Sequence, residues 1–144
     1  MEKLEGEVYE VDFGIYPRFL WIANDDSDLT GIKVKCVDGE YRDAESTEKI
    51  KSDCACTVEA KFGSYKGCLV YIGEDANIQT LCHESVHVAD YIFETLGMCA
   101  QDYEQKNEPY AYFVDFVFGK LYDAFTKDKW TFNWKKINYG GRTQ

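Results

Sequence analysis

The sequence predicts an α+β fold: a small, mostly antiparallel sheet packed against two helices, within a single domain over residues 1–144. The main observation is a change of hydrophobic period. Up to residue 72 apolar residues occur in short alternating or continuous runs, and from residue 75 they recur at three-to-four spacing. The second observation is composition. The chain is 45% hydrophobic and 16% aromatic, which is enough apolar material to fill one core.

The strands expected in the first half are bounded by turn residues. The segments EVYEVDF and GIKVKCV alternate between apolar and polar residues, and FLWIA is a short apolar run. The segment VEAKFGSYKGCLVYIG, residues 58–73, has the pattern of a hairpin, with GSYKG as its turn. The sequence therefore predicts a sheet built almost entirely before residue 75.

Two helices are expected in the second half, at about residues 76–96 and about 108–125. Apolar and small residues line one face of the first, and Gly97 is placed to end it. Asn107 is a suitable N-cap for the second helix. The tail after it, residues 127–144, carries two tryptophans and is expected to pack back as a strand or an irregular arm.

Charge and targeting signals exclude several classes of partner. The formal net charge is -10 and the isoelectric point is near 4.6, so phosphate backbones and anionic membranes are repelled. No stretch is long and apolar enough to span a bilayer, and the first fourteen residues lack the hydrophobic centre of a signal peptide. We therefore expect a cytoplasmic protein with reduced cysteines, no nucleic-acid partner and no membrane association.

Both histidines of the chain, His83 and His87, fall in the first predicted helix, with Glu84 between them. Residues four apart share a helix face at a separation of about 6 Å along the axis, so two imidazoles can point at one ion. Glu84 reaches a water bound to that ion. This is the H-E-x-x-H pattern, in which two histidines hold zinc and the glutamate is a general base. The alternative interpretation is a pair of surface histidines on an amphipathic helix.

The third metal ligand must be an acid, because no histidine remains. Glu108 comes 21 residues after His87, at the start of the second predicted helix. An antiparallel return of the chain would bring it back over the first helix. Glu104, in the connecting loop, and Asp90, one turn beyond His87, are the alternatives.

The segment HESVH followed by NEPYAYFVDF resembles the gluzincin metallopeptidases of the thermolysin-like clan, which carry HExxH on one helix and a glutamate ligand about twenty residues later on the next. The resemblance covers residues 67 to about 122, and is to the minimal members found in phages and mobile elements of bacteria. It implies a zincin-like fold and a zinc ion (Zn2+) held by His83, His87 and Glu108. The sequence departs from the family at Pro109, since a residue before proline avoids the helical conformation.

The expected activity is hydrolysis of a peptide bond in a peptide or protein substrate. Zinc lowers the pKa of its bound water, and Glu84 accepts the proton as that water attacks. Tyr110 or Tyr112, which follow the glutamate ligand, are favoured over Tyr91 and Tyr103 as the donor to the oxyanion. Two alternatives are a catalytically idle zincin-fold binding module, such as a phage protein that binds a host factor around a structural metal, and an acidic domain with an accidental motif.

The strand CLVYIG precedes the motif helix and is expected to be an open sheet edge beside the metal. A substrate peptide would add to this edge as an extended strand, antiparallel to residues 67–72. The alternative is a buried central strand without a free edge.

Overall fold

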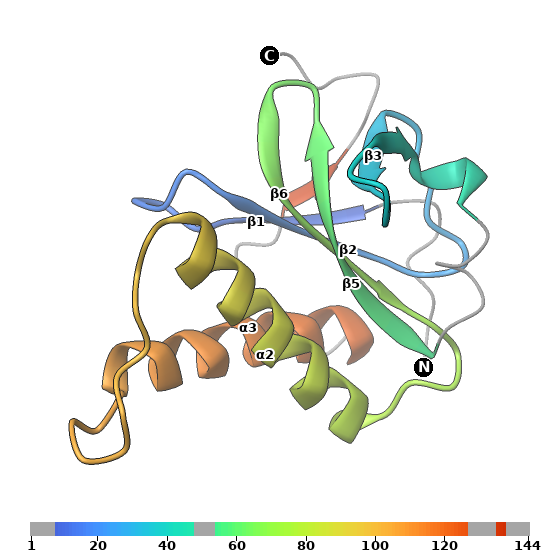
Figure 1. Ribbon diagram of the computed structural model, residues 1–144. Coiled ribbons are helices and arrows are strands. Elements are labelled where there is room, and N and C mark those ends of the chain that lie inside the picture. Colours follow the sequence, from blue (N-terminus) through green and yellow to red (C-terminus); the bar gives the residue numbers. More distant parts are fainter. Residues whose placement is uncertain (1–7, 48–53, 127–134, 138–144) are drawn as a thin grey trace.

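The computed structural model describes residues 8–47, 54–126 and 135–137 and confirms the α+β prediction (Figure 1). Within these residues the strands form one sheet in the order β4-β3-β5-β6-β2-β1-β7, with both helices on the same face. All neighbouring strands are antiparallel except β2 and β6, which are parallel. The strands are β1 (Val8–Asp12), β2 (Phe19–Ala23), β3 (Ile32–Lys35), β4 (Tyr41–Asp43), β5 (Ala55–Phe62), β6 (Tyr65–Ile72) and β7 (Lys135–Ile137), and a short 3-10 helix η1 (Ala44–Ser46) follows β4.

The expectation that CLVYIG forms an open edge is wrong. This segment lies in β6, which pairs with β5 on one side, from Ala55↔Ile72 to Phe62↔Tyr65. On its other side β6 pairs with β2, from Phe19↔Gly67 to Ala23↔Tyr71. The alternative of a buried central strand is therefore confirmed. The physical reason is that consecutive apolar residues suit a strand covered on both faces, and no peptide can add to a strand paired on both sides.

Helix α2 (Ile78–Thr95) begins and ends at clear signals. Asn77 is its N-cap and forms a capping box: its Oδ1 accepts from the Thr80 amide at 3.0 Å, and the Thr80 hydroxyl accepts from the Asn77 amide at 3.2 Å. At the other end Gly97 has φ of +70°, and the Met98 amide donates to the Phe93 carbonyl at 2.7 Å. Gly97 thus ends the helix as predicted, because glycine adopts the left-handed conformation without a steric penalty.

Helix α3 (Glu108–Thr126) begins at the predicted place but not by the predicted cap. Asn107 has φ of +46°, and its Oδ1 accepts a hydrogen bond from the Gln101 amide at 2.7 Å. The side chain therefore closes the connection between the helices instead of capping α3. Of the tail, only Lys135–Ile137 belong to the described residues, where they pair with β1 as β7. The two tryptophans of the tail lie outside the described residues.

Apolar side chains pack on both faces of the sheet. On the helix face, residues of β1, β2 and β6 pack against α2 and α3, with Leu81 and Leu121 fully buried. On the other face, a second cluster around Trp21 is covered by the segment that follows β2 and by η1. Neither α2 nor α3, the helices of the described residues, is long and apolar enough to cross a membrane.

Glycine at position 67 permits the parallel contact between β2 and β6, which generates a first prediction. A Cβ at this position would lie 2.0 Å from the Phe19 carbonyl oxygen, so Gly67→Ala should lower the free energy of unfolding by about 3 kcal/mol. Gly119 is the matched control: it lies in α3 with nothing within 4 Å of an added Cβ, and Gly119→Ala should stabilise by about 0.5–1 kcal/mol. Urea unfolding of both variants checks this, and losses of equal size would contradict it.

Candidate active site

Helix α2 presents the two histidines together on the face turned toward β5. Their Nε2 atoms form a hydrogen bond of 3.0 Å, and the rings are 4.7 Å apart between centroids with an interplanar angle of 77°. Two nitrogens bound to one tetrahedral zinc at their usual bond lengths lie about 3.4 Å from each other. Both rings are exposed. His83 and His87 therefore fit two of the ligand positions of a divalent metal ion.

Glu84 lies one position further round the helix and is only 5% exposed. Its Oε1 accepts a hydrogen bond of 2.7 Å from the hydroxyl of Thr57, which projects from β5. A buried carboxylate needs such a donor, because losing water without replacement is costly. The contact joins helix and sheet directly beside the histidine pair.

A cavity of about 480 Å³ lies between β5 and α2. Its lining includes Thr57 and Glu59 from β5, Cys68 from β6, and His83, Glu84, His87, Asp90, Tyr91 and Glu94 from α2. The lining holds four carboxylates and no lysine or arginine, and one of the four, Glu59, pairs with Lys35 at 3.8 Å. The three carboxylates without a lysine or arginine partner among the described residues give a field that favours cations over anions.

Tyr91 is the tyrosine that lines this cavity. Burial raises the pKa of its phenol to about 12, an effect that the neighbouring Arg18 guanidinium opposes. At neutral pH the phenol is therefore protonated and able to donate a hydrogen bond.

The open strand edge beside the motif belongs to β5. Its last residues, Ala60–Phe62, pair with β3, whereas no strand in the described part of the chain covers residues 55–58 on that side. The Gly73 amide donates to the Cys54 carbonyl at 2.7 Å, which makes these two residues a hydrogen-bonded pair. Because hydrogen-bonded and free positions alternate along an antiparallel strand, the N–H and C=O groups of Ala55 and Thr57 point away from β6.

The expected third ligand is not placed with the histidines. Glu108 is the first residue of α3 and is exposed, and Glu104 is exposed in the connection before it; neither lines the cavity. Of the three acids considered, Asp90 alone lines it. Across the described ranges, no three His, Cys, Asp or Glu side chains are grouped closely enough to hold a metal ion. Two side chains, His83 and His87, therefore have a geometry that suits zinc, and the structure assigns no third ligand.

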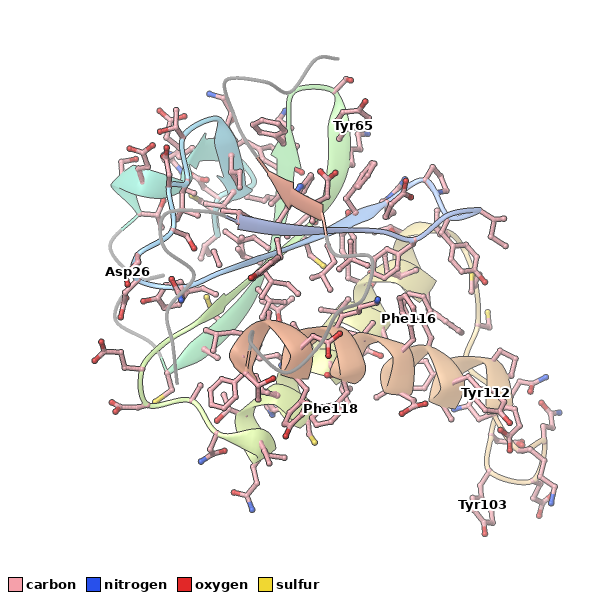
Figure 2. The ribbon with its side chains drawn as sticks, turned by 180° about the vertical axis from the view of Figure 1, so that it is seen from behind. Asp26, Tyr65, Tyr103, Tyr112, Phe116 and Phe118 are labelled. Atoms are coloured by element: carbon pink, nitrogen blue, oxygen red, sulfur yellow. The ribbon has the colours of Figure 1, made fainter. Side chains whose placement is uncertain are left out.

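The two tyrosines favoured as oxyanion donors also lie outside the cavity. The Tyr110 hydroxyl donates to Asp90 Oδ1 at 2.5 Å, and its ring packs edge-on against Phe93 at 5.2 Å between centroids. Tyr112 is 69% exposed and lies on the end of α3 close to the connection between the helices (Figure 2). Tyr110 thus joins the first turn of α3 to the turn of α2 that follows His87.

Several cavity residues were missed by sequence reasoning. Glu94 carried a usable signal: it follows His83 by eleven residues, which returns it to within about 20° of the same helix face. Thr57 and Glu59 carried no such signal in the sequence. Their position beside the motif depends on the packing of β5 against α2, which no local pattern encodes.

Comparison with known proteins finds no protein-family model, no curated protein and no solved structure that matches this chain. The resemblance to gluzincins therefore rests on the motif residues, and its interpretation rests on the geometry described above.

The contact between Tyr110 and Asp90 generates a prediction about helix packing. Tyr110→Phe should lower the free energy of unfolding by about 1 kcal/mol at neutral pH, a modest loss because the contact is partly exposed. Burial, together with the bond to Asp90, raises the pKa of Tyr110 to about 12. The neutral phenol is thus favoured in the folded state, and its contribution is complete below the ordinary tyrosine pKa of about 10 and lost as pH rises from there to about 12.

Urea unfolding of the wild type and Tyr110→Phe, at neutral pH and at intervals up to about pH 12, checks this expectation. The difference between the two proteins should shrink over the upper range. Tyr112→Phe is the matched control, because the Tyr112 hydroxyl has no hydrogen-bond partner in the described part of the chain. Equal losses of unfolding free energy in Tyr110→Phe and Tyr112→Phe would show that the contact with Asp90 does not account for the effect of Tyr110→Phe.

Proposed function

We propose that this protein is a zinc-dependent metallopeptidase of the gluzincin type, with Glu84 as its general base. The observation that carries the proposal is the convergence of the His83 and His87 Nε2 atoms, 3.0 Å apart, on a cavity beside the buried carboxylate of Glu84. The open edge of β5 along the same cavity adds a place for a peptide backbone.

In this proposal His83, His87 and Glu108 hold the ion. Zinc bound there would supply a Lewis acid for the substrate carbonyl and lower the pKa of water. Glu84 takes the proton from the attacking water and returns it to the leaving nitrogen. Since Thr57 donates to Oε1, the Oε2 atom is left for that proton. Glu108 lies two residues before Tyr110, whose hydroxyl bonds to Asp90 of α2, but the Glu108 carboxylate itself does not line the cavity.

The substrate in this proposal is an extended peptide paired with residues 55–58 of β5. The outward N–H and C=O groups of Ala55 and Thr57 would hold its backbone and set its register. The carboxylates of the cavity disfavour acidic side chains, so neutral and basic peptides are the expected class.

A second candidate function is a zincin-fold binding module without turnover. One observation favours it: the described residues bring no third metal ligand to the two histidines. A peptide docked on the β5 edge would then be bound and not cleaved.

Metal content and a conservative substitution at Glu84 separate these functions. We expect one zinc per chain by mass spectrometry of the purified protein, and none in His83→Ala or His87→Ala. Glu84→Gln should keep the zinc and reduce turnover of a peptide library by about 10²–10⁴-fold, since it removes general base catalysis and preserves shape. Equal turnover by Glu84→Gln and wild type would refute the proposed peptidase activity. Purified wild-type protein without zinc would mean that the H-E-x-x-H pattern is accidental.

The same zinc measurement identifies the third ligand. Glu108→Gln, Asp90→Asn and Glu104→Gln each remove one candidate carboxylate charge with little change in shape. We expect Glu108→Gln to weaken zinc binding most. A larger effect of Asp90→Asn would move the third ligand onto α2 itself.

The proposed docking edge is tested by proline at Ala55. Ala55→Pro removes an N–H that points away from β6, at the first position of the strand, where proline is tolerated. We expect kcat/KM for extended peptides to fall about tenfold, equivalent to one hydrogen bond, with zinc content and urea unfolding unchanged. Cys56→Pro is the contrasting control, because it removes an amide bonded to β6 and should destabilise the fold. Undiminished turnover by folded Ala55→Pro would exclude docking at this edge.

A further inference from the structure

We infer that Thr57 is the positioning residue for the general base, an inference that rests on the proposed function. Its hydroxyl fixes the orientation of the Glu84 carboxylate from across the cavity. Strand β5 would therefore both bind the peptide backbone and orient the general base. The two residues are 27 positions apart and belong to β5 and α2, and their bond of 2.7 Å crosses between the two elements.

Burial makes this contact decisive for the carboxylate. Glu84 is 5% exposed, and in the part of the chain that the structure describes its side chain has no other hydrogen-bond donor. The Thr57 hydroxyl thus supplies the interaction that compensates for lost hydration. Without it, the buried carboxylate loses its hydrogen-bond donor.

A general base must be correctly oriented as well as present. A base must lie within hydrogen-bond reach of the proton that it abstracts, and misplacement by about 1 Å can cost about 10²-fold in rate. A carboxylate is planar, so fixing Oε1 on Thr57 determines where Oε2 points. The bond therefore holds the proton-accepting atom of Glu84 in place before substrate arrives.

The position of Thr57 on β5 links this orientation to peptide docking. Its side chain faces α2, whereas its N–H and C=O groups point to the open edge. A peptide paired along residues 55–58 would hold the same stretch of strand that orients Glu84. Loss of the hydroxyl should therefore affect the rate of the bound complex and leave peptide binding, which uses the main chain, almost unchanged.

The test compares Thr57→Val, which keeps the shape and removes the hydroxyl, with Thr57→Ser, which keeps the hydroxyl. We expect Thr57→Val to lower kcat for an extended peptide by about 10–10²-fold, with KM changed less than about twofold and zinc content unaltered. Thr57→Ser should recover kcat to within about threefold of wild type. If Thr57→Val does not fold, Thr57→Ala takes its place with the same expectations. Unchanged kcat, or loss of kcat in both the valine and serine variants, would overturn the inference.

Thr80→Val is the matched control for stability. It makes the same substitution on a hydroxyl that bonds within the capping box of α2 and forms no hydrogen bond to Glu84. We expect it to lower the urea midpoint without changing kcat. A fall in kcat equal to that of Thr57→Val would show that loss of stability explains both, and would overturn the inference.

A second arm needs no turnover and separates failure of the inference from failure of the proposed function. In metal-free protein, Thr57→Val should lower the urea midpoint in the wild-type background and have no effect in Glu84→Ala, because the interaction is already absent there. If the stability result is as expected but zinc-loaded wild-type protein cleaves no peptide, the proposed peptidase activity is rejected. The role of Thr57 as the partner that orients Glu84 is then retained. Equal effects in both backgrounds would reject the role of Thr57 whatever the activity.

Discussion

The parallel pairing of β2 with β6 is the constraint on which the rest of the structure depends. It requires a close backbone approach that Gly67 permits, and it places β6 in the centre of the sheet with partners on both sides. A chain that leaves a central strand must cross onto one face, and α2 accordingly packs over β5 and β6. The cavity lies between α2 and β5.

The open edge follows from unequal strand lengths. Strand β5 has eight residues and β3 has four, and their pairing covers only Ala60–Phe62. Within the described residues, no strand therefore pairs with the first half of β5 on the side of β3, beside the motif of α2. Sheets usually protect such edges with charge, a bulge or a covering segment, so an uncovered edge beside a cavity is where a peptide could add.

The three motif residues occupy environments that suit different roles. His83 and His87 are exposed, which leaves their Nε2 atoms accessible to an ion entering from solvent. Glu84 is buried and bonded to Thr57, which restricts its motion at a cost in hydration. Access for ligands and fixed position for a base are the properties that hydrolysis at a metal requires.

The sequence by itself determined the α+β class, the β5–β6 hairpin, both helices, the end of α2 at Gly97 and the shared face of His83 and His87. All of these depend on contacts within a few residues, where period and capping chemistry act directly. The turn of the hairpin is shorter than predicted, since it spans residues 63–64 and β6 begins at Tyr65. Tertiary structure alone decided the strand order, the edge on β5 in place of β6, and the contact of Thr57 with Glu84. It also decided that Tyr91 faces the cavity while Tyr110 does not. These features depend on pairing and packing between distant segments, and the apolar run of β6 is compatible with either a central or an edge position until β2 is placed beside it.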